Sequence, residues 1–133
     1  MTRYSTHFTE AELRDPTTGE IKLEDGFIDQ LEDLRLAYGY PMAVTSGCRS
    51  SEHNEWLTQR GYAASPHSLH LMNNPHYGTN TLAVDITRPG IYRLRTLIGE
   101  ALARGWTVRL ADSFVHLDLR GRYTDLKPHF DTY

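Results

Sequence analysis

Two short apolar segments, each with an ionisable residue near its centre, constrain this chain most. Residues 81–87 read TLAVDIT, and residues 114–120 read FVHLDLR. Both alternate with a period of two, as strands with one buried face do. Burying a carboxylate costs several kcal/mol unless the group is paired or binds a metal. The pattern therefore predicts two strands that turn Asp85 and His116 toward a cleft.

Helical patterns surround these strands. In the segment that ends at Gly39, apolar residues recur near helical spacing at Phe27, Leu31, Leu34 and Leu36. A second such stripe is the clearest helix of the sequence, with Ile91, Leu94, Leu97, Ile98, Ala101 and Leu102 on one face. Capping residues indicate two further helices, a short one after Thr9 and one from Ser50 or Ser51 to Gly61.

The remaining segments complete the expected fold class. Further strands are predicted over residues 42–45 and 106–111, and the polar, Asn-rich stretch 62–80 is predicted to be a loop. Helices combined with a largely antiparallel sheet indicate an α+β fold. The 133 residues suit a single domain over positions 1–133, and a monomer is the default expectation at this size.

Charge and hydropathy exclude several classes of protein. The formal net charge is −3, whereas general nucleic-acid binding needs a basic field. No apolar run is long enough to cross a bilayer, and the N-terminal MTRYSTHFTEAEL lacks the apolar core of a signal peptide. Synthesis in the cytoplasm without a signal peptide is therefore expected. The lone Cys48 cannot form an internal disulfide, and we expect it to be a packing residue.

Histidine is abundant, with seven residues in the chain and four of them between His53 and His76. Histidine and aspartate are ligands that a catalytic zinc uses, and three protein ligands leave a position open for water. His70, upstream of the Asp85 strand, could be the third ligand. The alternatives are that Asp85 forms an ion pair, for example with Arg49, and that His116 is a core residue with its hydrogen bonds satisfied.

Five segments, in order along nearly the whole chain, resemble one known family: HFTEAEL, VTSGCRSSEHN, SLH, LAVDI and SFVHLDLR. The family is the zinc-dependent M15 peptidases, D-Ala-D-Ala carboxypeptidases and endopeptidases that include many phage endolysins. The chain is most similar to their small single-domain branch. The resemblance implies a hedgehog/DD-peptidase-like fold, with a small antiparallel sheet flanked by helices.

Carried over by position, the resemblance implies that His70, Asp85 and His116 bind zinc. The spacing from His70 to Asp85 exceeds that of the family signature, which indicates an insertion over residues 71–80 beside the metal. Thr81 stands where the family has a glycine. His67 and His76 are rival first ligands, but neither has the S-x-H context of His70.

The resemblance also implies a catalytic acid three places before the last histidine, and here that place is Ser113. Asp118 falls on the same strand face as His116, so it is our candidate for the general base or for a partner of His116. Asp112 is the alternative base. Asp118 could instead form a structural ion pair with Arg120 or Arg88.

Arg49 is the candidate substrate-binding residue, because a guanidinium binds a carboxylate through two parallel hydrogen bonds. The family's substrates are cell-wall peptides with free carboxylates, and Ser68 could donate a further hydrogen bond to them. The alternative is a solvated surface arginine.

Together these features predict a zinc peptidase that hydrolyses a stem peptide or crossbridge of bacterial peptidoglycan. A phage or prophage endolysin that reaches the wall after its release from the cell fits the expected absence of a signal peptide. The competing hypothesis is a non-catalytic, metal-binding relative that acts as a binding module or a structural part of a virion. A metal-free structural domain is a third possibility, and it would need another partner for Asp85.

Overall fold

The computed structural model describes residues 2–133, and it confirms the α+β class. The helices are α1 Glu10–Leu13, α2 Phe27–Tyr38, α3 Ser51–Gln59, α4 Ile91–Ala103 and α5 Arg120–Tyr123. The strands are β1 Val44–Ser46, β2 Ala83–Thr87, β3 Thr107–Leu110, β4 Phe114–Asp118 and β5 Phe130–Thr132.

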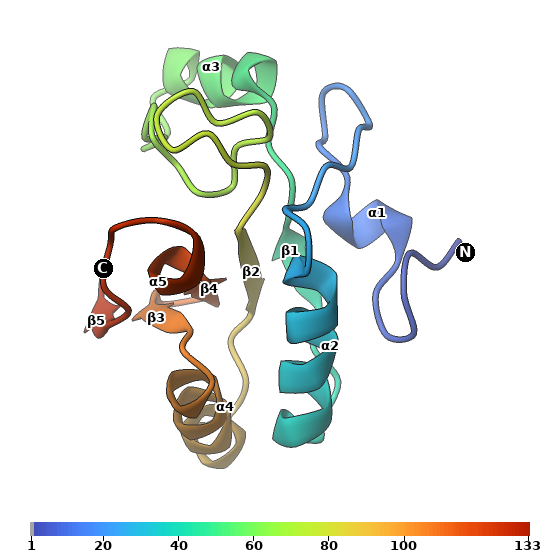
Figure 1. Cartoon of the computed structure of the whole chain (residues 1–133), viewed down its shortest axis with the longest axis vertical. Helices are drawn as coiled ribbons and strands as arrows, with labels where there is room; N and C mark the ends of the chain where they lie inside the picture. The colour runs from blue at the N-terminus through green and yellow to red at the C-terminus, as the bar shows by residue number, and fades with distance from the viewer. Residues whose placement is uncertain (1) are drawn as a thin grey trace.

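The strands form one sheet in the order β1-β2-β4-β3-β5. All neighbouring pairs are antiparallel except β3 and β5, which run parallel. In Figure 1, α2 and α4 lie side by side toward one end of the molecule, and α3 with the loop that follows it lies at the other end. Asp85 and His116 are opposite each other between these ends, on β2 and β4.

The sheet packs against a core that α2 and α4 supply. Helix α2 buries Phe27, Leu31, Leu34 and Tyr38, and the Phe27 ring meets Trp106 edge-on at 5.6 Å between centroids. The prediction that Leu36 shares this face is wrong: Leu36 is 66% exposed. Residues two apart point to different sides of a helix, so Leu36 cannot join the stripe through Leu34.

In helix α4, too, fewer apolar residues are buried than the sequence predicts. Leu94, Leu97 and Ala101 are buried as predicted, but Ile91 and Leu102 are exposed. Ile91 lies in the first turn of the helix, and Leu102 lies at the edge of the stripe next to Ala101. The buried face is therefore narrower and shorter than the run of apolar residues indicates.

The N-terminal segment braces β1 and α3. Thr9 and Glu12 form a capping box on α1, and the Glu12 carboxylate also accepts a hydrogen bond from the Val44 N–H at 2.9 Å. Asp15 is fully buried and accepts hydrogen bonds from the backbone N–H and the hydroxyl of Ser50, both at 2.8 Å. Glu12 thus contacts the first residue of β1, which begins two residues later than the predicted 42–45, and Asp15 contacts the residue that caps α3.

Residues 62–80 lack helices and strands other than isolated bridges, as predicted, yet they are well packed. Leu69, Leu71 and Met72 are buried. Asn74 organises the turn that follows, because its side-chain oxygen accepts hydrogen bonds from the backbone N–H groups of His76 and Tyr77. The loop therefore presents a defined wall to the rest of the molecule.

Among residues 2–133, every helix is too short or too polar to span a bilayer.

Candidate metal centre

Strand pairing brings Asp85 and His116 together. Asp85 of β2 and His116 of β4 are direct cross-strand partners. Side chains directly opposite each other on antiparallel strands lie on the same face and within contact distance. The Nδ1 atom of His116 lies 2.9 Å from Oδ1 of Asp85.

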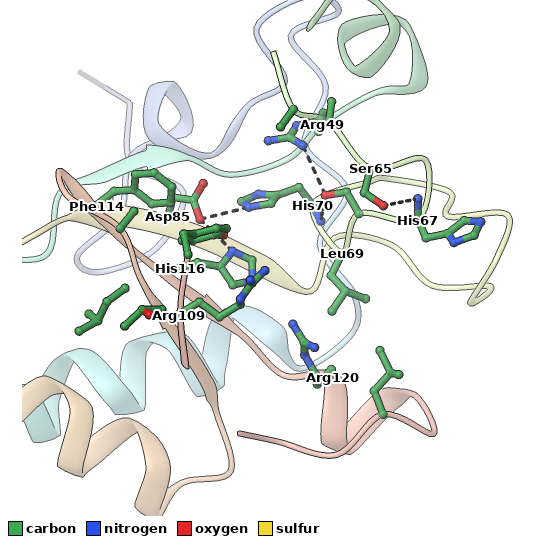
Figure 2. A pocket seen from close by; sticks show the side chains of 18 of the residues that line it. Arg49, Ser65, His67, Leu69, His70, Asp85, Arg109, Phe114, His116 and Arg120 are labelled. Atoms are coloured by element: carbon green, nitrogen blue, oxygen red, sulfur yellow. Dashed lines mark hydrogen bonds and ion pairs between the residues drawn. The ribbon is translucent and has the colours of Figure 1, made fainter. Parts of the chain in front are cut away.

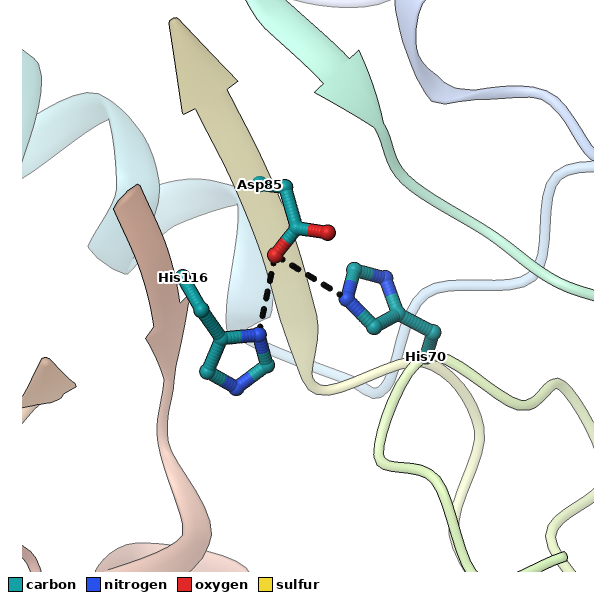
Figure 3. Close-up of side chains that lie close together, drawn as sticks. All are labelled: His70, Asp85 and His116. Atoms are coloured by element: carbon teal, nitrogen blue, oxygen red, sulfur yellow. Dashed lines mark hydrogen bonds and ion pairs between the residues drawn. The ribbon is translucent and has the colours of Figure 1, made fainter. Parts of the chain in front are cut away.

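His70 approaches the same carboxylate from the loop (Figure 3). Its Nε2 atom lies 3.3 Å from Oδ1 of Asp85. The carbonyl of His70 accepts hydrogen bonds from the Arg49 N–H at 2.9 Å and from the Thr81 hydroxyl at 2.8 Å. Thr81 thus helps to hold His70. One ligand atom from each of His70, Asp85 and His116 lies within 4.8 Å of the others.

The outer nitrogens of both histidines have hydrogen-bond acceptors. Nδ1 of His70 lies 2.8 Å from the carbonyl oxygen of Gly47, and Nε2 of His116 lies 2.7 Å from Oδ2 of Asp118. A carbonyl and a carboxylate only accept, so these nitrogens carry the protons. The inner nitrogens, Nε2 of His70 and Nδ1 of His116, can therefore present lone pairs to a metal.

Gly47 is packed tightly where it makes this contact. A methyl group at Gly47 would lie 2.8 Å from the carbonyl oxygen of Leu13 and 2.9 Å from its Cα. The end of α1 thus presses on the peptide group that orients His70, and only glycine fits between them.

Electrostatics favour charged forms within the group. Burial alone would raise the pKa of Asp85, but His70, together with the hydrogen bonds from His116 and His70, holds it well below its usual value. Burial would likewise lower the pKa of His116, but its hydrogen bonds to Asp118 and Asp85 outweigh this and raise the pKa to about 9. Without a metal, a protonated His116 thus compensates the charge of the two carboxylates.

The three groups fit a metal ion by the chemistry of their donors. Two imidazoles and one carboxylate are a ligand set that catalytic zinc sites use, and each imidazole has an acceptor behind it that fixes its tautomer. The group also lines an open cleft of about 1190 Å³, so a fourth position could be reached by water or substrate. His70, Asp85 and His116, the three ligands predicted from the sequence, are thus brought together.

Asp118 lies behind His116, away from the cleft. It is fully buried, and it pairs with Arg120 as well as with His116. Nη2 of Arg120 lies 2.7 Å from Oδ2 of Asp118, and Nε lies 2.9 Å from Oδ1. Asp118 therefore forms both the ion pair with Arg120 and the hydrogen bond to His116 that the sequence offered as alternatives. This enclosure leaves Asp118 without direct access to the cleft.

Asp112 and Ser113 occupy the turn between β3 and β4. Both are exposed, and Asp112 lines the cleft. In the described chain, Asp112 and Asp85 are the acidic residues among those that line it. The structure thus separates the two candidate bases by environment, one enclosed and one open to solvent.

The rival ligands His67 and His76 stand apart from the group. Their rings stack on each other, with centroids 3.9 Å apart, and both are exposed. Within residues 2–133, neither belongs to a group with metal-ligand spacing. The insertion 71–80 nevertheless borders the cleft, because Tyr77 is one of its lining residues.

Arg49 reaches the cleft on the His70 side, where Figure 2 shows it above the group. Its Nη1 atom lies 3.4 Å from both Oδ1 of Asn54 and Oγ of Ser68. Burial lowers the pKa of Arg49, and the negative charge of Asp85 partly offsets this. In residues 2–133, no carboxylate comes within ion-pair distance of it, so the alternative pairing with Asp85 is not formed.

Several residues that line the cleft are not among the candidates from the sequence: Tyr77, Arg109 and Tyr133. Arg109 could have been found, because it alternates correctly with the buried Val108 on the strand next to His116. Tyr133 follows β5, and nothing in the local pattern indicates that β5 pairs with β3.

Comparison with known proteins places these features in a family. A family model described as Peptidase M15 matches residues 6–118, which include His70, Asp85 and His116. No curated protein and no solved structure matches the chain.

Proposed function

Because the chain belongs to the M15 peptidase family, we propose that it is a zinc-dependent peptidase that hydrolyses a stem peptide or crossbridge of bacterial peptidoglycan. The observation that carries the proposal is the meeting of two imidazoles and a carboxylate at an open cleft, each imidazole backed by a hydrogen-bond acceptor. Family membership gives the peptidase class. The metal, the substrate and the role as a phage or prophage endolysin that acts on the wall are our inference.

His70, Asp85 and His116 would hold the zinc, which when bound polarises the scissile carbonyl and lowers the pKa of a water molecule toward neutrality. The protein's own contribution is to keep both imidazoles in the ligand tautomer. The Gly47 carbonyl does this for His70, and the Asp118 carboxylate does it for His116. We therefore assign Asp118 a positioning role.

Asp112 is our candidate for the general base. Its carboxylate is exposed and lines the cleft, so it can accept the proton of the attacking water. The same proton would then pass to the leaving amine nitrogen as the peptide C–N bond breaks. Asp118 cannot easily take this role, because both of its oxygens are engaged with His116 and Arg120.

The charge of the cleft favours an acidic peptide. Its lining includes Arg49, Arg88, Arg109 and Arg120 but only two aspartates, on a chain whose net charge is −3. Arg49 is half-buried, and its guanidinium has only long contacts to neutral groups. A substrate carboxylate would supply the missing counter-charge, and the Ser68 hydroxyl could donate to it. Cell-wall peptides carry such carboxylates.

The proposal is tested by measuring bound zinc and the release of amines from purified peptidoglycan, with and without chelator. We expect stoichiometric zinc and hydrolysis that the chelator abolishes and added zinc restores. Asp112→Asn should keep its zinc and lose most of its hydrolysis. Undiminished hydrolysis by zinc-free protein would refute zinc dependence.

Zinc binding without hydrolysis of any peptidoglycan would favour a second candidate, a non-catalytic binding module or virion structural part. The observation behind this candidate is Ser113, which stands where the resemblance implies a catalytic acid.

A further inference from the structure

Four strands place ionisable side chains in one row across the sheet. Asp85 on β2 pairs with His116 on β4, His116 pairs with Arg109 on β3, and Arg109 pairs with Asp131 on β5. Residues paired in this way point to the same face of a sheet. Arg109 is therefore the direct neighbour of a candidate metal ligand, on the side away from Asp85.

The C-terminal strand holds Arg109 in place. Its Nε atom donates to Oδ1 of Asp131 at 2.8 Å, and its guanidinium lies over the ring of Tyr133, 4.2 Å from the centroid. Tyr133 is itself tied to β3, because its N–H donates to the Leu110 carbonyl at 2.9 Å. Within residues 2–133, neither terminal nitrogen of Arg109 makes a hydrogen bond. An oriented guanidinium thus keeps donors for a ligand in the cleft.

The other arginines of the cleft are placed differently. Arg120 binds the enclosed Asp118, and Arg88 donates through Nη1 to the Ala111 carbonyl at 2.8 Å. Arg49 adjoins His70, whose carbonyl accepts its N–H, whereas Arg109 adjoins His116. Figure 2 shows Arg49 above the group and Arg109 below it. Two guanidinium groups thus flank the metal centre from opposite sides.

We propose that Arg109 forms a second carboxylate-binding point, on the His116 side of the metal centre, as Arg49 does on the His70 side. The preferred substrate is then a peptide with a carboxylate on each side of the bond that is cut. This inference rests on the proposed function. Asp131 and Tyr133, which orient Arg109, lie beyond the matched range 6–118. The family match therefore does not assign this carboxylate-binding point.

The test uses the tripeptide L-Ala-γ-D-Glu-L-Lys, whose two carboxylates flank its last peptide bond. Three forms are compared: the diacid, the form amidated at glutamate and the form amidated at the C-terminus. Binding is measured by calorimetry in the presence of chelator, which keeps the peptide intact during the titration. The proteins are the unaltered chain, Arg109→Gln, Arg49→Gln and the matched control Arg88→Gln.

We expect Arg109→Gln to weaken binding of the diacid about five- to tenfold, the range for a charge-assisted contact at a partly exposed group. It should have little effect on the one amidated peptide that has lost the carboxylate facing Arg109. Arg49→Gln should show the reciprocal pattern. Arg88→Gln should weaken each of the three affinities by less than about twofold, without sparing either amidated peptide.

Equal weakening of the two amidated peptides by Arg109→Gln would indicate only a general field, and no weakening of the diacid would remove the site; either result overturns the inference. If Arg109→Gln does not fold, Tyr133→Leu decides instead. This variant keeps the charge of Arg109 but removes the aromatic ring beneath its guanidinium. It should therefore reduce the preference for the diacid over the amidated peptides, and an unchanged preference would contradict the inference. Reciprocal binding with no hydrolysis of peptidoglycan by the zinc-loaded protein would refute the proposed function alone, and such hydrolysis without reciprocal binding would refute the subsite alone.

Discussion

The sheet and the loop position their candidate metal ligands in different ways. Asp85 and His116 are set by the pairing of β2 with β4, so the backbone ladder fixes their separation. His70 lies in a loop. Its ring bonds to the Gly47 carbonyl, and its own carbonyl accepts from the Thr81 hydroxyl and from the Arg49 N–H in an isolated bridge between Arg49 and Leu71. The sheet should therefore tolerate the loss of one side-chain contact better than the loop, which has fewer backbone hydrogen bonds around its candidate ligand.

The largest effect is expected for Asp85→Ala, which removes the shared carboxylate of both regions. Without it, the remaining imidazoles cannot hold zinc at three points, and we expect hydrolysis to fall about a thousandfold or more. Zinc content by atomic absorption and the rate of amine release measure this. The control is His76→Ala, a histidine of the same neighbourhood outside the group, which should retain its zinc. Full zinc occupancy in Asp85→Ala would contradict the assignment.

The second prediction concerns the pH dependence of the metal-free protein and probes the sheet region. The pKa of His116 is about 9 in the folded protein, against an ordinary 6.5. Its stabilising charge is therefore fully present below about pH 6.5 and is lost as the pH rises through 9. We expect the free energy of unfolding, measured by urea denaturation with chelator present, to fall by about 3 kcal/mol over this range. In His116→Gln the fall should be largely absent, and an equal fall there would assign it to other groups.

Third, Asp118→Asn tests whether strand pairing alone can hold His116. The amide keeps the shape of the carboxylate but loses its charge and its strong hydrogen bond, so we expect zinc affinity to drop about 10- to 100-fold. Competition with a chromophoric chelator measures the affinity. Asp112→Asn is the matched control, because it should lower turnover and leave zinc affinity unchanged. The reverse result would exchange the roles of the two aspartates.

The smallest effect is predicted in the loop region, for Thr81→Val. It removes the hydroxyl that donates to the His70 carbonyl, and we expect a loss of about 1 kcal/mol in unfolding free energy with a weaker zinc site. Thr79→Val is the control: within residues 2–133 its buried hydroxyl has no hydrogen-bond partner, so stability should stay equal or rise. Equal losses in both variants would show that the His70 contact has no special value.

The strand residues of the site could be predicted because their signal is local. A charged residue inside an apolar, alternating segment is costly, and both LAVDI and FVHLDL carry one. His70 could not be located this way. Its loop has no period, and the choice of His70 over His67 and His76 rested on the resemblance of SLH to a family motif.

The features that the sequence did not predict, strand β5 and the exposed positions on α2 and α4, depend on contacts between segments far apart in the chain. β5 is short and partly exposed, and it gains its place by joining the edge of β3. The exposure of Leu36, Ile91 and Leu102 likewise follows from which turns of α2 and α4 reach the sheet. Periodicity defines a face, but only the packed neighbours define how much of that face is covered.

Gly47 links the N-terminal helix to the chemistry of the cleft. Its peptide group has Leu13 on one side and the His70 ring on the other, so Gly47 fixes the distance between the end of α1 and that ring. A single added methyl group would push in both directions, toward α1 and toward the ligand. Substitutions that move the end of α1 are therefore expected to change the affinity of the proposed metal site, although α1 itself contributes no ligand to it.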